Sequence, residues 1–411
     1  MKKFLSAALA LVIVISTVFA LASCGDKADG FKPVAKEDLK IGMITLHDDS
    51  STYDKNFIES MYRALENKGL NRDQLVLYTG IDETEACYNT AKACANDGCQ
   101  VVFADSFGHE DFMIQAAQEF KSVRFCHATG TKAHTVKLAN FSNAFASIYE
   151  GRYLAGIAAG LKLNEMIESG KITADQAVMG YVGAYTYAEV MSGYTSFYLG
   201  AKSVCPSVTM KVRFTGSWYD TDKEAAAAKA LIETDKCVLI SQHADSYGAP
   251  NTCEQAGVPN ISYNGSTEAQ GPNTYIVSSK IDWAPYFEYM IDCVVKGEAI
   301  ATDWTGTIQT GSVKLEAVNT KVAAAGTQDA INAAKAQFEA GTLKVFDTAK
   351  DNFITVDGKK LESYLADVDT DANFEKDTEV VKDGYFHESE YRSAPYFDVT
   401  IDGITLINTA F

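Results

Sequence analysis

The alternation of short apolar runs with helical segments most constrains the fold of this 411-residue chain. In the first half, four runs rich in strand formers are separated by segments whose apolar residues have helical spacing. The predicted strands are Leu39–Leu46, Leu75–Tyr78, Val101–Ala104 and Val123–Cys126, and the helices are Phe57–Leu65, Glu83–Ala95 and Asp111–Phe120. This rhythm predicts a parallel sheet with helices on both faces.

A second series of the same kind follows a predicted helix at Phe145–Leu163. Its strands are Ala177–Val182, Val208–Phe214, Cys237–Ser241 and Asn260–Tyr263, and its helices are Glu189–Lys202, Thr221–Thr234 and Asn251–Ala256. We expect the strand Thr274–Ser279 and the helix Trp283–Val295 to complete the first sheet, and Val313–Val318 to return to the second. The chain is therefore α/β, with two doubly wound parallel-sheet lobes. Residues 345–411 are acidic and rich in turns, with short strands at Phe353–Val356 and Phe397–Leu406, and predict a peripheral α+β extension.

The N-terminus has the pattern of an export signal. Lys2 and Lys3 precede an apolar stretch, Phe4–Leu21, which ends in Leu-Ala-Ser-Cys at Cys24. That ending resembles the bacterial lipobox, in which the cysteine is acylated and becomes the mature N-terminus. The alternative is a transmembrane anchor, for which about 20 apolar residues are needed. We therefore expect a signal peptide over residues 1–23, lipidation at Cys24, a polar tether over 24–38 and a location on the extracytoplasmic face of the cell membrane.

The net charge of −18 excludes several partners. Nucleic-acid binding calls for a basic surface, and adhesion to anionic lipid calls for basic clusters. Eight cysteines remain after Cys24, and no Cys-x-x-Cys motif indicates a zinc site. We assign no disulfide, although Cys87 with Cys94 or Cys99 would be the first local pair to test.

Candidate binding residues follow the predicted strands, because ligands of open parallel sheets bind beyond the carboxyl ends of the strands. Each such segment combines aromatic rings with carboxylates, hydroxyls or amides. The segments are 47–53, 105–108, 183–189, 218–220, 242–247, 263–265 and 281–283. Aromatic faces stack on a flat ring and polar groups bond its edge, which suits a nucleobase or nucleoside.

These residues also have simpler interpretations. An aromatic residue at a strand end more often packs than binds, and Asp105, Ser106 and Asp220 could be helix caps. His243 and Asp245 could form a metal site or an acid–base pair, but no third ligand follows at regular spacing. Phosphate-binding loops and nucleophile elbows are absent from the sequence. We therefore expect no catalysis, no metal and no cofactor.

At these same positions the chain resembles the basic membrane protein family of ABC-transporter substrate-binding lipoproteins, and most of all its purine-binding branch. The matching stretches occur in family order between residue 39 and about residue 318. They are Phe103–Gly108, Phe125–Gly130, Ile148–Ile157, Gly180–Ala184, Glu189–Ala201, Gln242–Ser246 and Trp283–Tyr286.

The resemblance implies a type I periplasmic-binding fold, with two lobes joined by three hinge crossovers and a ligand in the cleft. We expect crossings near residues 142, 266 and 311. Lobe 1 would then hold residues 39–142 and 266–311, lobe 2 would hold 143–265 and 312–344, and 345–411 would form the extension. The implied partners are a permease and an ATPase, and we expect a monomer.

The resemblance also implies ligand contacts, which would fall at Tyr53, Phe107, Tyr149, Glu189, Asp245 and Trp283. Asp105, Ser106 and Asn264 are further candidates at the same strand ends. The chain departs from the branch at Ser51, where a Trp is common, and at 263–267, which reads Tyr-Asn-Gly-Ser-Thr where the branch tends to have an Asp that nucleoside-binding members use for ribose. The second departure favours a free base, or a different small ligand, over a nucleoside.

Four functions remain open from the sequence. The first is a transport receptor for a purine base or nucleoside, and the second is a receptor for a sugar or signalling molecule on the same fold. The third is an enzyme that uses His243 and Asp245, and the fourth is a surface adhesin that binds through its tail. The ring-stacking aromatic residues at several strand ends favour the first.

Overall fold

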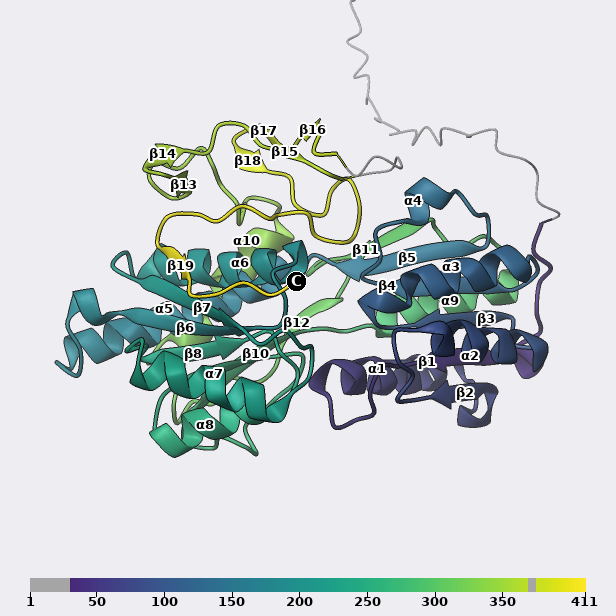
Figure 1. Cartoon of the computed structure of the whole chain (residues 1–411), viewed down its shortest axis with the longest axis horizontal. Coiled ribbons are helices and arrows are strands. Elements are labelled where there is room, and N and C mark those ends of the chain that lie inside the picture. The colour runs from purple at the N-terminus through teal and green to yellow at the C-terminus, as the bar shows by residue number, and fades with distance from the viewer. Residues whose placement is uncertain (1–29, 369–374) are drawn as a thin grey trace, which may run out of the picture. The chain divides into compact units, whose positions relative to one another are not determined.

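The first lobe is built on a six-stranded sheet in the order β2-β1-β3-β4-β5-β11 (Figure 1). The computed structural model describes residues 30–368 and 375–411. All neighbouring strands of this sheet are parallel. The strands are β1 (Ile41–Ile44), β2 (Leu75–Tyr78), β3 (Val101–Ala104), β4 (Arg124–Ala128), β5 (Phe141–Ala146) and β11 (Asp303–Gly306).

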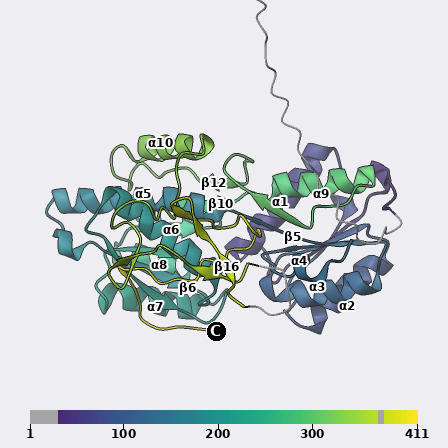
Figure 2. The same cartoon turned by 90° about the horizontal axis from the view of Figure 1, so that it is seen from above.

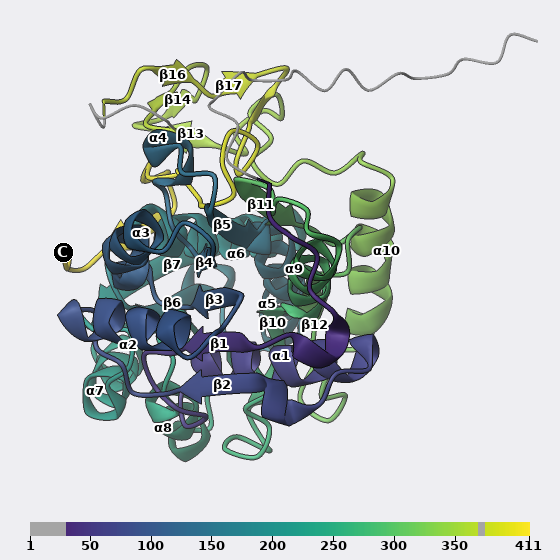
Figure 3. The ribbon, with the colours of Figure 1, turned by 90° about the vertical axis from the view of Figure 1, so that its right-hand side faces the viewer.

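Helices cover both faces of this sheet. Figure 3 shows α2 (Glu85–Asn96) and α3 (Glu110–Glu119) on one side, and α1 (Thr52–Lys68) and α9 (Ala284–Lys296) on the other. Within β3, Val102 packs in the cluster that contains α2 and α3, whereas Phe103 packs in the cluster that contains α1 and α9. Successive side chains of a strand point to opposite faces, so a strand buried on both faces is continuously apolar. The short helix α4 (Ala133–Val136) precedes β5.

The second lobe holds a seven-stranded sheet in the order β12-β10-β9-β8-β6-β7-β19. Its strands are β6 (Val178–Gly183), β7 (Thr209–Phe214), β8 (Leu239–Gln242), β9 (Asn260–Tyr263), β10 (Tyr275–Ile281), β12 (Val313–Leu315) and β19 (Ile404–Leu406). Only β12 is antiparallel to its neighbour. The helices are α5 (Ile148–Glu168), α6 (Ala188–Val204), α7 (Thr221–Glu233), α8 (Gly248–Ala256) and α10 (Thr327–Glu339).

The predicted fold class is confirmed, with one strand in a different sheet. The chain passes between the sheets after β5, after β10 and after β11. The strand expected to complete the first sheet, β10, instead pairs with β9 in the second, and β11 completes the first. The crossing expected near residue 266 therefore lies between Ile281 and Ala284. An apolar run predicts a strand, but it does not encode which sheet the strand joins.

The C-terminal extension is more integrated than its sequence suggests. Figure 2 shows it over the helices of the second lobe. Its last strand, β19, pairs with β7 in parallel, and Phe346 stacks on Phe397 with ring centroids 4.5 Å apart. The described part of 345–411 contains only short strands and no helix, so the predicted α+β character is wrong. These strands are β13 (Thr355–Val356), β14 (Lys359–Lys360), β15 (Leu365–Ala366), β16 (Thr378–Glu379), β17 (Val381–Lys382) and β18 (Tyr385–Phe386).

Two general features of the described residues bear on function. No helix in residues 30–368 and 375–411 has the length and apolar character that a bilayer crossing requires. The eight cysteines from Cys87 to Cys293 are all buried free thiols, so the local pair considered from the sequence is not formed in this structure.

Candidate functional site

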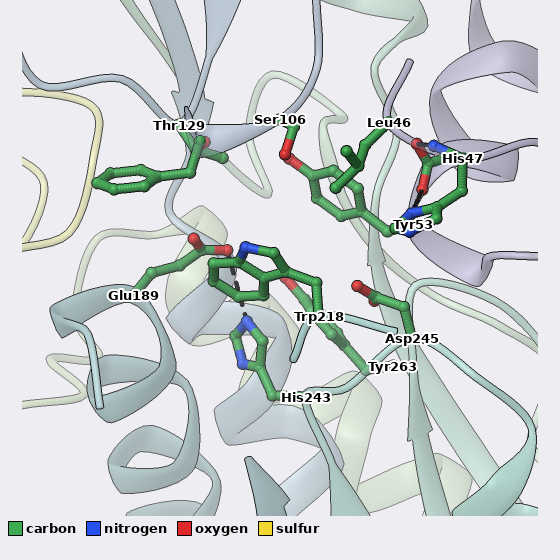
Figure 4. A pocket seen from close by; sticks show the side chains of 12 residues that line it. Leu46, His47, Tyr53, Ser106, Thr129, Glu189, Trp218, His243, Asp245 and Tyr263 are labelled. Atoms are coloured by element: carbon green, nitrogen blue, oxygen red, sulfur yellow. Dashed lines mark hydrogen bonds and ion pairs between the residues drawn. The ribbon is translucent and has the colours of Figure 1, made fainter. Parts of the chain in front are cut away.

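A pocket lies where the carboxyl ends of the two sheets face each other. Its unfilled space is about 370 Å³, which includes open solvent at its mouth. Both lobes contribute to the wall (Figure 4). The first lobe provides Leu46, His47, Tyr53, Asp54, Ser106, Phe107 and Thr129, and the second provides Glu189, Trp218, His243, Asp245 and Tyr263. A ligand there would touch both lobes at once.

Five of the nine predicted binding residues line this pocket: Tyr53, Ser106, Phe107, Glu189 and Asp245. Their positions follow from the topology. Tyr53 is in the first turn of α1, Phe107 follows β3, Glu189 is in the first turn of α6 and Asp245 follows β8. Helix starts and strand ends meet at the same edge of a parallel sheet, which brings these residues to the cleft.

Two more predicted residues lie directly behind the wall. Asn264 donates from Nδ2 to Asp245 Oδ1 at 3.0 Å, and Tyr53 donates its hydroxyl to the backbone oxygen of Asp105 at 2.7 Å. Burial raises the pKa of both Asp105 and Asp245 well above the usual range for a carboxyl. Burial therefore disfavours the charged form of both acids, and a carboxyl in its protonated form donates a hydrogen bond as well as accepting one.

The remaining two, Tyr149 and Trp283, are not brought to this pocket. Trp283 is 1% exposed and stacks on Phe57 in the core of the first lobe, with ring centroids 4.3 Å apart. The strand before Trp283, β10, belongs to the second sheet, and the helix after it, α9, packs on the first sheet. Trp283 therefore enters the core of the first lobe and not the cleft. Tyr149 donates its hydroxyl to the backbone oxygen of Glu388 at 3.3 Å and lines a separate cavity beside the extension.

In the first lobe, Asp54 holds His47 at the pocket. The Asp54 carboxylate accepts from His47 N at 2.8 Å and lies 3.3 Å from His47 Nδ1. Ser51 caps α1 and also donates to Asp54, at 2.5 Å. Burial raises the pKa of Asp54, but the hydrogen bonds from His47 and Ser51 outweigh it and lower that pKa below its usual value. Asp54 is thus a fixed anion.

In the second lobe, His243 is the central polar group. Its Nε2 lies 3.4 Å from Glu189 Oε1, and its ring centroid lies 4.7 Å from that of Tyr263. Burial lowers the pKa of His243, although Glu189 opposes this, so the ring is neutral. Trp218 adds an aromatic face from the loop after β7.

The candidate segments at strand ends include His47, Trp218, His243 and Tyr263, but these four are not among the predicted ligand contacts. Their common signal is position, since each follows or ends a strand at the carboxyl edge. Leu46 and Thr129 also follow strands, β1 and β4, but lie outside the candidate segments, and Asp54 lies in the first turn of α1. Which of these side chains point inward depends on loop conformation, which residue type does not encode.

The pocket is suited to binding a neutral or cationic ligand. Three carboxyl side chains line it, and neither Lys nor Arg is among the lining residues. An anionic ligand would lose hydration without gaining a countercharge. Across residues 30–368 and 375–411, no group of three His, Cys, Asp or Glu residues is arranged to hold a metal ion.

The two lobes also touch directly at the pocket edge. Thr52 at the start of α1 donates to the backbone oxygen of Asp245 from both its amide and its hydroxyl, each at 3.1 Å. This contact joins the two walls that a ligand would bridge. The structure therefore represents a closed arrangement of the cleft.

Two α/β lobes, three crossings and a pocket between the lobes define a bilobal solute-binding protein. The family model described as "ABC transporter substrate-binding protein PnrA-like" matches residues 41–342, and this chain belongs to that family. The resemblance drawn from the sequence is thus confirmed.

Three curated relatives illustrate the similarity. A purine-binding protein of Brucella abortus is 31% identical over 271 residues, which cover 64% of this chain and 71% of that protein. A protein of Haloferax volcanii named "Putative ABC transporter glucose-binding protein" is 31% identical, with 54% of this chain and 53% of that protein covered. A nucleoside-binding protein of Lactococcus lactis is 26% identical, with 53% and 59% covered.

Solved structures agree on the fold. A solute-binding protein of Aeropyrum pernix aligns with a TM-score of 0.63 and 15% identity, over 76% of this chain and 94% of that one. Another from Conexibacter woesei aligns with a TM-score of 0.58 and 18% identity, over 77% and 99%. At this identity the match concerns the fold alone.

Proposed function

We propose that this protein is the lipid-anchored receptor of an ABC transporter and captures a purine base or nucleoside in the interlobe pocket. One observation carries the proposal: aromatic rings from both lobes surround a pocket whose lining holds several carboxyls and neither Lys nor Arg. Phe107 and Tyr53 would meet one side of a planar ring, and Trp218 and Tyr263 the other. Carboxyls at the edge would bond the ring nitrogens and amino groups.

A free base fits the pocket better than a nucleoside. The stretch 263–267 contains no acid where nucleoside-binding members of the family use one for ribose, and its Asn264 is 3% exposed and bonds Asp245 instead of lining the pocket. Residues 263–267 contribute no carboxylate to the pocket lining that could hold a ribose diol. The three carboxyls that line the pocket, Asp54, Glu189 and Asp245, come from other elements.

Closure would couple binding to delivery. A ligand that contacts Tyr53 in one lobe and Asp245 in the other binds the closed state better than the open one, and so shifts the population toward closure. A permease and its ATPase can then recognise the loaded receptor by its shape. The ligand is released unchanged, so no catalysis is required of His243 or Asp245.

A second candidate is a sugar receptor, because one relative is named for glucose. Calorimetry with the mature protein separates the two. We expect adenine, guanine and hypoxanthine to bind, their nucleosides to bind more weakly, and glucose and pentoses not to bind. Tight binding of a sugar with no heat from any purine would overturn the proposal in favour of the second candidate.

The lipid anchor rests on Leu21–Cys24, which lies outside the described residues. We expect Cys24→Ala to remove the acylation site, so that the protein accumulates in the medium or as uncleaved precursor. Cell fractionation and labelling with a tagged fatty acid measure this. Ser23→Ala, which keeps a small residue before the cysteine, serves as the control. A wild-type protein that carries no fatty acid would contradict the anchor.

A further inference from the structure

A chain of hydrogen bonds leads from a buried arginine to the pocket. Arg152 of α5 is 0% exposed and donates from Nη2 to the Tyr181 hydroxyl oxygen at 3.0 Å. That hydroxyl lies 3.3 Å from His243 Nδ1, and His243 Nε2 lies 3.4 Å from Glu189 Oε1. Of these residues only His243 and Glu189 line the pocket.

The donor and acceptor groups determine the direction of each hydrogen bond in this series. A guanidinium can only donate, so the Tyr181 oxygen accepts from Arg152 and keeps its one proton for another acceptor. Tyr181 is fully buried, and within the described residues the acceptor in range of its hydroxyl is His243 Nδ1. A proton on Nδ1 would leave the Tyr181 hydroxyl buried without an acceptor, which is strongly disfavoured.

The hydrogen bond at the Glu189 end of this series leads to the same position for the proton on His243. A neutral histidine carries one ring proton, and if Nδ1 accepts, that proton is on Nε2. Nε2 faces Glu189 Oε1, and an ionised carboxylate can only accept. The donor at Tyr181 and the acceptor at Glu189 therefore favour one tautomer from opposite sides of the ring.

We propose that Arg152 and Tyr181 are positioning residues that hold His243 in its Nε2–H tautomer, so that the pocket offers an N–H donor beside the Glu189 acceptor. If the proposed function is correct, the ligand must present an acceptor next to a donor on one edge. Adenine does so with N7 and its N6 amino group. Arg152 also donates to Ser241 Oγ at 2.9 Å and Ser262 O at 3.3 Å, which hold the guanidinium in place.

Nitrogen-15 NMR of histidine-labelled, ligand-free protein tests the tautomer, with His243→Gln to identify the signal. We expect His243 to show a protonated Nε2 and an unprotonated Nδ1. Glu189→Gln should keep this pattern, because a glutamine amide can donate or accept and leaves the choice to Tyr181. Adding Tyr181→Phe to Glu189→Gln should give a mixture of tautomers, whereas adding Tyr194→Phe should not.

Tyr194 is a matched control, because its ring packs on Tyr181 with centroids 5.8 Å apart and its hydroxyl takes no part in the hydrogen bonds from Arg152 to Glu189. A protonated Nδ1 in the wild type, or mixed tautomers in Glu189→Gln alone, would overturn the proposal without any need for the double variants to fold.

A binding measurement tests the consequence for the ligand. In the wild type, replacing N1, N3 or N7 of adenine in turn by C–H should cost about tenfold in affinity at one position, where His243 would lose its acceptor. Equal affinity for all three analogues would overturn this role of His243. If no purine binds at all, the proposed function fails, while the histidine spectra still decide the tautomer.

Discussion

Replacing Asp245 with alanine is expected to weaken purine binding by about a hundredfold. Asp245 lines the pocket and is 5% exposed, and Asn264 occupies one of its carboxyl oxygens, which leaves the other for a ligand. Burial raises the pKa of this carboxyl, and in its protonated form the carboxyl both donates to and accepts from a heterocycle edge. Loss of a buried hydrogen-bonding partner costs about 1–3 kcal/mol, and tenfold in affinity corresponds to about 1.4 kcal/mol.

Calorimetry of two further variants separates this effect from general damage. Asp245→Asn keeps the shape and the oxygen that accepts from Asn264, so we expect it to lose less affinity than Asp245→Ala. Asp222→Ala removes an exposed carboxylate from α7 and should bind as the wild type does. The lobe contact is retained in all three, because Thr52 bonds the backbone oxygen of residue 245. Wild-type affinity in Asp245→Ala would remove Asp245 from the ligand contacts.

The sequence predicted several of the residues that line the interlobe pocket because of a property of parallel sheets. Each apolar run ends in a loop on the same edge, so Tyr53, Phe107 and Asp245 could be grouped without any knowledge of side-chain packing. Trp283 also follows a predicted strand, so the same rule placed it at the pocket, but it lies in the core of the first lobe. Its helix follows β10, whose sheet is decided by pairing with β9, a choice made by long-range packing.

The predicted α+β character of the extension was wrong for a similar reason, because long-range pairing determines its structure. Ile404 of β19 pairs with Met210 of β7, a partner 194 residues earlier in the chain, and the strand itself spans only three residues. Periodicity over three residues cannot separate a sheet-edge strand from a loop. In the pocket, His243 was visible at a strand end, but its role depends on Tyr181 and Arg152 beneath it, which only the folded arrangement brings together.

Alanine at position 156 is expected to destabilise the second lobe by about 3 kcal/mol, because α5 and α6 touch there through their backbones. A Cβ atom at Gly156 would lie 2.0 Å from the backbone oxygen of Phe197, and one at Gly200 would lie 2.0 Å from that of Tyr153. No rotamer change relieves a clash with a carbonyl, so the helices must separate. Overpacking a core typically costs 1–3 kcal/mol, and this contact is at the severe end.

Gly151→Ala is the matched control, because it lies in the same helix and its added Cβ would meet side chains, with Val313 Cγ1 the nearest at 2.9 Å. That strain is partly offset by the helix propensity of alanine, which exceeds that of glycine by about 1 kcal/mol. Urea unfolding followed by circular dichroism should therefore show a much lower midpoint for Gly156→Ala than for Gly151→Ala. Equal midpoints would mean that α5 and α6 can separate at little cost. Such freedom would be hard to reconcile with the site, because α5 carries Arg152 and α6 carries Glu189, and the hydrogen-bond chain through His243 requires both helices to stay in place.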